Sequence, residues 1–352
     1  MNILYVTDNL ISSSVFKSQV DNICNAHSEF NEVKVLAFCK PKDLNYTNES
    51  RYELIKFMRL PLFSIEPVAT FIATMFYRKE LFDWADIIHC RGHGPMLMAS
   101  KLLDKYSLDK KIIFDVRGAV VNEIREAKSN RVYQFISDKL KITEEQCFKR
   151  ADSLFYVSDS MRVHFSSLYD IKCNNAIIPT IVNEKYFKPM PDMRDEIRCK
   201  EGFEGKFVYV YSGGKDYWQN LDLILKKFSQ MIKLDSNIVL LLLVIDLEYL
   251  NKLIVELGIC RDNIVIKSLE YEDVGKYLNA SDAGLIIRSN SIVNLVASPT
   301  KINEYVACGL KIVDSLDEIG NLEYNANYLS ENYMPLHSAI ERQCEVYRNL
   351  IK

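Results

Sequence analysis

The apolar run Ile3-Leu4-Tyr5-Val6 opens the chain, and Phe16, Val20, Ile23 and His27 follow it at helical spacing. A short continuous apolar run predicts a buried strand, and spacings of three or four residues predict a helix packed against it. The same alternation recurs, with strands expected at 33–38, 54–60, 87–90, 112–116, 154–157 and 177–178, and helices near 95–106 and 131–150. Such alternation predicts an α/β fold with parallel strands and helices on both faces.

A second run of strands begins after residues 183–205, where prolines, glycines and many charges indicate a linker or connecting segment. Strands are expected there at 207–211, 237–245, 264–266 and 285–287, with helices between them. We therefore expect two Rossmann-like domains facing across a cleft. Their expected bounds are 1–182 and 183–334, and a helix over 335–352 is expected to pack back on the first domain.

The bulk composition excludes several classes of protein. The 352 residues are 48% hydrophobic, which is enough for two cores, and the net charge of −3 gives no reason to expect a nucleic-acid partner. Nine cysteines occur without a Cys-x-x-Cys pair or a Cys/His cluster, so neither a zinc site nor a disulfide framework is indicated. No secretory signal and no apolar run of about 20 residues is present, and we expect a cytoplasmic protein.

The stretch 65–82 is apolar on more than one face and ends near Arg78 and Lys79. It fits a helix that docks on a membrane, or a helix buried against the sheet. We favour the buried helix. Docking would place the protein at the inner face of the cytoplasmic membrane, as a peripheral contact.

The segment from Ser298 to Gly309 carries the clearest ligand signal. Ser298 suits an N-cap, Pro299 the first helical position and Gly309 the C-terminal end, so a short helix with a defined start is predicted. A helix N-terminus attracts anions, and Lys301 adds a cation where an acid is otherwise favoured. Glu304 lies one turn beyond Thr300 and could accept hydrogen bonds from a ribose. The alternative is a capped surface helix with a solvated lysine.

Two further segments are expected at the carboxyl ends of strands, where α/β sheets bind ligands. Arg288 follows the expected strand 285–287, and Gly213-Gly214-Lys215 follows the expected strand 207–211. Arg288 would meet a diphosphate, and the glycines would let the backbone approach it closely. The alternatives are an ordinary surface arginine and a simple turn.

Taken together, these motifs resemble the bacterial polysaccharide glycosyltransferases of the GT-B fold, in particular glycosyltransferase family 4. The resemblance rests on Arg288…Asn294…Ala297-Ser298-Pro299-Thr300-Lys301…Glu304-Tyr305…Ala307-Cys308-Gly309-Leu310 and on five earlier stretches: Asp86-Ile87-Ile88-His89, Ile113-Phe114-Asp115-Val116-Arg117-Gly118, Val157-Ser158, Ile178-Pro179…Val182…Phe187-Lys188-Pro189 and Tyr211-Ser212-Gly213-Gly214. The family is a group of retaining nucleotide-sugar transferases.

The resemblance implies a donor set and an acceptor set. The donor set comprises Gly213, Gly214, Lys215, Glu270, Arg288, Asn294, Ser298, Pro299, Thr300, Lys301 and Glu304. Residues after strands of the first domain would face the acceptor, namely Asp8, Asn9, Arg91 and Glu123. Arg117, His93 and Glu304 are the expected catalytic residues; for His93, packing in a turn is an equal alternative.

The chain departs from the family pattern at several places. Val296 stands where many members carry the first of two glutamates, Arg117 where many carry a histidine, and Gly214 and Gln219 where many carry an arginine and a lysine. Lys215, Arg288 and Lys301 are expected to supply the missing charges.

The expected activity is sugar transfer from a nucleotide-sugar donor to a saccharide or lipid-linked acceptor in surface polysaccharide synthesis, as in lipopolysaccharide or capsule. The chain contains no Asp-x-Asp motif, so no metal and no cofactor are expected. A nucleotide-sugar 2-epimerase of the same fold, with Asp115 and Glu123 as its acid/base pair, is the alternative. A two-lobed periplasmic binding protein is disfavoured by the free cysteines and the lack of a signal peptide.

Overall fold

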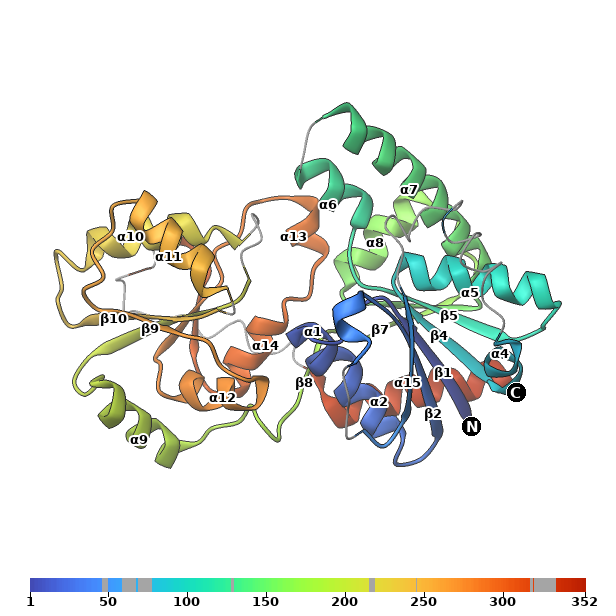
Figure 1. Cartoon of the computed structure of the whole chain (residues 1–352), viewed down its shortest axis with the longest axis horizontal. Coiled ribbons are helices and arrows are strands. Elements are labelled where there is room, and N and C mark those ends of the chain that lie inside the picture. The colour runs from blue at the N-terminus through green and yellow to red at the C-terminus, as the bar shows by residue number, and fades with distance from the viewer. Residues whose placement is uncertain are drawn as a thin grey trace. The chain divides into compact units, whose positions relative to one another are not determined.

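A computed structural model of the chain describes residues 1–45, 50–58, 68, 78–127, 130–214, 219–244, 246–316, 319 and 334–352. These residues belong to two compact units (Figure 1). The first unit comprises Met1–Pro179, Leu295–Ser298 and Leu336–Lys352, and the second comprises Thr180–Asn294 and Pro299–Pro335. Most of the stretch 65–82, for which membrane docking was considered, lies outside the described residues.

The first unit is built on a parallel sheet of seven strands in the order β3-β2-β1-β4-β5-β6-β7. Its central strands are the apolar runs of the sequence, and Leu4, Val6, Ile87, Ile88 and Phe114 are fully buried among them. The strands are β1 (Asn2–Thr7), β2 (Glu32–Cys39), β3 (Glu53–Met58), β4 (Ile87–Arg91), β5 (Lys111–Val116), β6 (Ser153–Tyr156) and β7 (Asn174–Ile177).

Helices connect these strands, as parallel pairing requires. They are α1 (Ser14–Phe16), which runs through a π-helical turn at Lys17–Asp21 into α2 (Asn22–His27), then α4 (Lys79–Trp84), α5 (His93–Tyr106), α6 (Val120–Ala127), α7 (Arg131–Arg150) and α8 (Asp159–Leu168). A 3-10 turn spans Pro41–Asp43.

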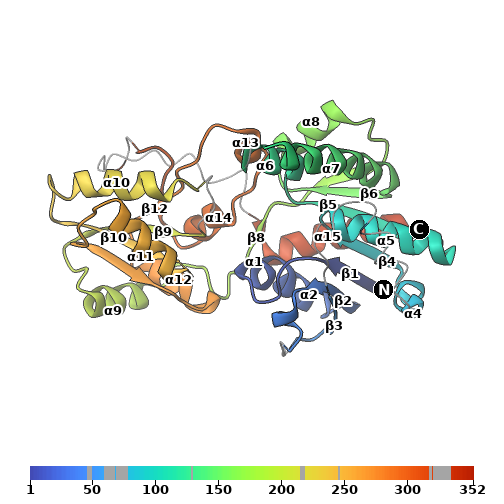
Figure 2. The same cartoon turned by 45° about the horizontal axis from the view of Figure 1, so that its top comes forward.

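The C-terminal helix α15 (Leu336–Ile351) belongs to the first unit and contacts α2. Figures 1 and 2 both show this helix, in red, beside elements from the start of the chain. Three of its buried side chains contact histidines: Gln343 Oε1 lies 2.8 Å from His27 Nε2, Cys344 Sγ lies 3.6 Å from His27 Nδ1, and Tyr347 Oη lies 2.6 Å from His89 Nδ1. These contacts fix the helix to the core of the first unit.

The second unit has a parallel sheet of five strands in the order β11-β10-β9-β12-β13. Successive side chains point to opposite faces of a strand, so Leu240 and Leu242 enter one hydrophobic core and Val239 and Leu241 enter the other. The strands are β9 (Phe207–Ser212), β10 (Ile238–Leu243), β11 (Ile264–Lys267), β12 (Ala283–Leu285) and β13 (Lys311–Val313); β8 (Ile181–Val182) pairs separately with β14 (Met334–Pro335).

The helices of the second unit are α9 (Pro191–Glu201), α10 (Leu221–Met231), α11 (Leu247–Glu256), α12 (Tyr271–Asn279) and α14 (Thr300–Ala307), and α13 (Ile292–Val296) runs across the boundary between the units. The segment 183–205, expected to be a linker or connecting segment, contains a helix that was not predicted, α9. Arg194 Nη2 and Arg198 Nη1 bind the two carboxylate oxygens of Asp282 at 2.6 and 3.2 Å, and Ile197 is buried beneath the helix. Besides Ile197, these ion pairs and hydrogen bonds from the two arginines to the carbonyls of residues 279–281 hold the helix.

No helix among the described residues is both long and apolar enough to span a membrane.

Candidate functional site

The strand orders locate one candidate site in each unit. In both sheets the order reverses beside the first strand, between β1 and β4 in the first unit and between β9 and β12 in the second. Open α/β sheets bind ligands at such a switch point, outside the carboxyl ends of the strands. The residues that follow these four strands are therefore the ones to inspect.

In the second unit the backbone is tightly packed after β9. A Cβ on Gly213 would lie 2.8 Å from Tyr211 Oη, so a larger residue there would require the neighbouring side chains to shift. Tyr211 Oη donates to Gly214 O at 2.7 Å, and the Gly213 amide donates to Leu243 O at 3.2 Å. The two glycines thus form an ordered turn at the switch point. Lys215, also assigned to the donor, lies outside the described residues.

Arg288 lies at the same switch point, after β12. The expected strand 285–287 was placed too late: β12 ends at Leu285, and Arg288 comes three residues further on. The reason is that β12 and β13 pair only as far as Leu285 with Val313. The guanidinium is part-buried, Nη1 donates to Asn294 Oδ1 at 3.3 Å, and none of the described carboxylates forms an ion pair with it. Burial lowers the pKa of Arg288.

Helix α14 starts one residue later than the sequence suggested. Pro299 is its N-cap, with ψ of 118°, and makes no side-chain cap, so the assignment of Ser298 as the N-cap was wrong. Pro299 has no N–H to lose, and its carbonyl accepts from the Ile302 amide at 3.1 Å. Thr300 therefore opens the helix, and its N-cap residue offers no side-chain acceptor to the first amides.

Two donor-site residues on α14 pair with each other. Lys301 Nζ lies 3.0 Å from Glu304 Oε2, and the Glu304 side chain is only 1% exposed. The next residue, Tyr305, is fully buried and its hydroxyl accepts from the Ser212 amide at 2.8 Å. This hydrogen bond joins α14 directly to the end of β9, so the glycine turn and the helix form one structure.

Glu270, also assigned to the donor, follows a strand that lies two places from β9 in the sheet. It is exposed at the N-cap of α12, after the edge strand β11, and β10 lies between that strand and β9.

In the first unit the switch point carries a buried cluster of charge. Arg91 ends β4, and its Nε donates to Asn9 Oδ1 at 2.9 Å. Asp115 Oδ2 accepts from Arg117 Nε at 2.7 Å, and Arg91 Nη1 lies 3.5 Å from the same oxygen. His89 Nε2 also contacts it, at 3.2 Å. The structure thus brings together three predicted residues, Asn9, Arg91 and Arg117, around Asp115.

The protonation states in this cluster follow from burial and charge. Burial alone raises the pKa of Asp115, but Arg117, His89 and Arg91 outweigh it and hold the pKa well below the ordinary value. Burial lowers the pKa of His89. The cluster near neutral pH is therefore one carboxylate facing two guanidinium groups and a neutral imidazole.

The remaining acceptor residues lie on the loops around this cluster. Asp8 follows β1, and its Oδ1 would be 3.8 Å from a Cβ on Gly92, a residue with φ of +92°. Glu123 lies on α6, and its carboxylate occupies the space next to Gly118, immediately after Arg117. Both loops keep a glycine where the backbone approaches a carboxylate.

His93 has a different setting from the one expected of a catalytic residue. It is the first residue of α5, its side chain is 3% exposed, and its Nε2 lies 2.9 Å from Glu144 Oε2 on α7. Tyr169 Oη donates to the other oxygen of Glu144 at 2.7 Å. These contacts support the alternative of a packing role, and catalysis by His93 stays a prediction that this geometry does not favour.

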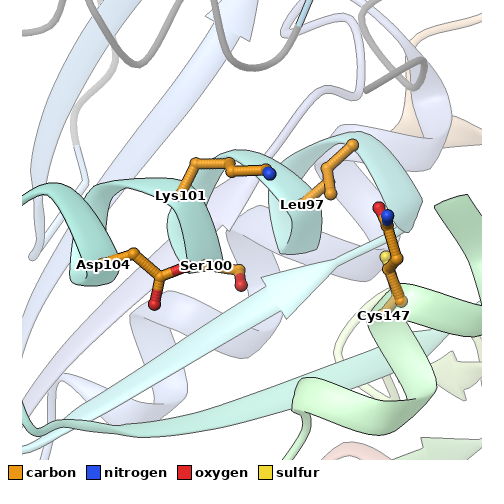
Figure 3. Close-up of a pocket in the computed structure, with 6 residues that line it drawn as sticks. Leu97, Ser100, Lys101, Asp104 and Cys147 are labelled. Atoms are coloured by element: carbon orange, nitrogen blue, oxygen red, sulfur yellow. The ribbon is translucent and has the colours of Figure 1, made fainter. Parts of the chain in front are cut away.

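A pocket of about 180 Å³ lies between α5 and α7 and contains none of the predicted site residues (Figure 3). It is lined by Leu97, Ser100, Lys101, Asp104, Gln146 and Cys147. Among the described residues, no group of three or more His, Cys, Asp or Glu side chains is arranged to hold a metal ion.

The sequence matches no protein-family model and no curated protein. The structure is similar to sucrose-phosphate synthase from Thermosynechococcus elongatus, with a TM-score of 0.67 and 13% identity over 99% of this chain and 90% of that chain. It is similar to HepE from Anabaena, solved with UDP-glucose, with a TM-score of 0.67 and 12% identity over 100% and 90%. WaaG, a glycosyltransferase involved in lipopolysaccharide biosynthesis, has a TM-score of 0.61 and 14% identity over 100% and 90%.

These similarities define a class by its architecture. The chain has the GT-B fold of two Rossmann-like domains, and the expected fold class is confirmed. At these identities the comparison establishes the fold alone.

Three residues of the two sites carried no assigned role in the sequence analysis. Tyr305 joins α14 to β9, His89 supports Asp115, and Tyr347 reaches His89 from the other end of the chain. Tyr305 and His89 stand inside the quoted motifs, so the motifs marked the positions without revealing their partners. No local signal marks Tyr347.

Proposed function

We propose that the chain is a glycosyltransferase that moves a sugar from a nucleotide-sugar donor to a saccharide or lipid-linked saccharide acceptor. The observation that carries the proposal is Arg288, a part-buried guanidinium at the switch point of the second unit with no carboxylate partner among the described residues. A partly buried cation is stabilised when a counterion pairs with it, and a bound ligand can supply that anion. The diphosphate of a nucleotide sugar supplies it.

The chemistry of the reaction fits this placement. The bond between sugar and diphosphate lengthens in the transition state, and negative charge grows on the leaving diphosphate. A cation fixed beside those oxygens stabilises the transition state more than the bound substrate, which lowers the barrier. Arg288 and the first turn of α14 are the groups we assign to this task. Lys301 contributes less net charge, because Glu304 pairs with it.

Several finer points of the proposal rest on the sequence resemblance and on the solved relatives. We propose that transfer retains the anomeric configuration, and that the protein's own cations take the place of a metal ion, since the chain has no Asp-x-Asp motif. HepE was solved with UDP-glucose, and WaaG acts in lipopolysaccharide biosynthesis, which supports a nucleotide-sugar donor and a role in surface polysaccharide. A lipid-linked acceptor would bring the protein to the inner face of the cytoplasmic membrane.

The epimerase alternative is weakened by the state of Asp115. An acid/base residue must gain and release a proton near the working pH. Two arginines hold the pKa of Asp115 low, so this carboxylate stays ionised and is a poor proton donor.

Calorimetric titration of the full chain with UDP, GDP and ADP tests the donor site. We expect at least one of them to bind, and Arg288→Gln to weaken that binding ten-fold or more, since a charge-assisted hydrogen bond contributes about 1.5–3 kcal/mol. Arg261→Gln is the matched control, because Arg261 is exposed beyond α11 and away from the switch point. If none of the three nucleotides binds, or if the two variants bind equally well, the assignment of the donor site is wrong.

A further inference from the structure

A row of hydrogen bonds connects the C-terminal helix α15 to the carboxyl edge of the first unit's sheet. Tyr347 Oη lies 2.6 Å from His89 Nδ1, and His89 Nε2 lies 3.2 Å from Asp115 Oδ2. The same oxygen accepts from Arg117 Nε at 2.7 Å. Tyr347, His89 and Asp115 are fully buried, whereas the Arg117 side chain is 13% exposed. One of the expected catalytic residues is therefore linked to the end of the chain through buried side chains.

The direction of each hydrogen bond follows from the protonation states. Burial raises the pKa of Asp115, but the surrounding cations and hydrogen bonds outweigh burial and hold the pKa well below its ordinary value, so the carboxylate accepts. Burial lowers the pKa of His89, so its ring is neutral and carries one N–H. That proton must lie on Nε2, facing the carboxylate, which leaves Nδ1 as an acceptor. Burial raises the pKa of Tyr347, so its hydroxyl stays protonated and donates to Nδ1.

The orientation of the Asp115 carboxylate depends on these contacts. The hydrogen bonds from His89 and Arg117 both end on Oδ2, whereas Oδ1 has no hydrogen-bond partner among the described residues. Rotation of the carboxylate would bring Oδ1 to the arginine and displace the guanidinium. The His89 ring resists that rotation because packing fixes it: its centroid lies 4.3 Å from that of Tyr5, in a stack, and 5.4 Å from that of Phe155. The ring therefore determines which oxygen faces Arg117.

We propose that His89 and Tyr347 are positioning residues, which orient the Arg117 guanidinium through Asp115. The part of Arg117 in sugar transfer rests on the proposed function; the coupling of Tyr347 to Arg117 rests on the row of hydrogen bonds. Donation by Tyr347 to Nδ1 strengthens the bond from Nε2–H to Asp115, because hydrogen bonds in a chain polarise one another. The guanidinium is therefore held in its place only when α15 is docked on the first unit.

The proton on His89 gives the first test, by NMR of the full chain labelled with ¹⁵N-histidine. The His89 signals are identified by their absence in His89→Gln. We expect the proton on Nε2 and a bare Nδ1. A proton on Nδ1 would reverse the direction of the row, and the proposal would be refuted.

Exchange of the Arg117 Nε proton with solvent measures how firmly the guanidinium is held, and loss of its NMR signal in Arg117→Lys identifies it. Tyr347→Phe keeps the ring and removes the hydroxyl, so exchange should be roughly two- to ten-fold faster, the factor that one ordinary hydrogen bond contributes. His89→Leu should accelerate it further, and His89→Gln, whose amide can still donate to Asp115, should recover most of the loss. If His89→Leu does not fold, Tyr347→Phe decides alone. Wild-type exchange in Tyr347→Phe overturns the proposal.

Tyr52→Phe is the matched control. Tyr52 is also buried in the first unit, and its hydroxyl donates to the buried carboxylate of Asp21 at 3.0 Å. This variant loses a comparable hydrogen bond outside the row, so Arg117 exchange should stay at the wild-type rate. Equal acceleration in Tyr52→Phe and Tyr347→Phe would mean that lower stability alone frees the arginine, which contradicts a positioning role.

The exchange experiment needs no ligand, so its result is independent of the donor site. A chain that binds no nucleotide would refute the proposed function, and the exchange rates would still decide whether Tyr347 holds Arg117. In the opposite case, nucleotide binding with wild-type exchange in Tyr347→Phe would refute this inference and leave the donor site intact.

Discussion

Replacing Gly284 by alanine tests the contact between β12 and Tyr305, the residue that joins α14 to β9. Gly284 lies in the middle of β12, paired with Val210 of β9 on one side and Ile312 of β13 on the other. A Cβ at this position would lie 2.6 Å from Cγ and Cε2 of the Tyr305 ring, and closer still to Cδ2. Ordinary carbon contacts are about 3.5–4.0 Å, so either the ring or the strand must shift by about 1 Å.

The magnitude follows from what surrounds the ring. Tyr305 is completely buried, and inserting a methyl group into a packed core costs about 1–3 kcal/mol. A displaced ring also loses its hydrogen bond to the Ser212 amide, which is worth about 0.5–1.5 kcal/mol. We expect Gly284→Ala to destabilise the second unit by about 2–4 kcal/mol, a fall in melting temperature of roughly 4 to 16 °C for a unit of this size.

Scanning calorimetry of the full chain measures the effect, and a double-mutant cycle assigns it. In a Tyr305→Leu background the smaller side chain leaves room for the methyl group, so Gly284→Ala should cost much less there. Nucleotide affinity should fall in the single variant, because the bond between Tyr305 and Ser212 joins α14 to the end of β9. An unchanged melting temperature for Gly284→Ala, or the same loss in both backgrounds, would refute the steric argument.

Two other perturbations probe the packing of each unit. Burial lowers the pKa of His27 from 6.5 to about 4, against the opposing effect of its bond to Gln343. Below pH 6.5 the unfolded chain therefore takes up a proton that the folded chain does not, and stability should fall by up to about 1.4 kcal/mol per pH unit as the pH drops from 6.5 to 4. Urea unfolding across this range should show a smaller slope for His27→Gln, and an identical slope would contradict the assignment. In the second unit, Asp282→Asn removes the charge that holds Arg194 and Arg198, and we expect a loss of about 2–4 kcal/mol by urea unfolding. A loss below 0.5 kcal/mol would mean that α9 is held by its other contacts.

The sequence predicted most strands because buried parallel strands are continuous apolar runs. Residues 87–90 and 112–116 were expected as strands, and β4 and β5 cover them. Helix α9 was not predicted because it has almost no apolar periodicity: its single buried apolar side chain is Ile197. The arginines on this helix bind Asp282, more than 80 residues away in sequence. Such a contact cannot be predicted from the spacing of apolar residues.

In the candidate sites, too, the positions of residues were predictable but their side-chain partners were not. Residues that follow strands, such as Arg91, Arg117 and Arg288, could be placed because topology alone puts them at the carboxyl edge. The pairing of Lys301 with Glu304 and of His93 with Glu144 could not, because each depends on the side-chain conformation or on a partner elsewhere in the chain. His93 was expected to contact a ligand because it follows β4, but its ring contacts Glu144 of α7 instead.

The hydrogen bond between His89 and Tyr347 also bears on how the protein is made. The two residues are 258 positions apart, so at a ribosomal rate of about 5–20 residues per second Tyr347 is added roughly 10 to 50 s after His89. Throughout that interval the His89 imidazole and the apolar surface that α15 covers in the folded protein are not yet covered. A chaperone that covers this surface during translation would protect it until the final helix arrives.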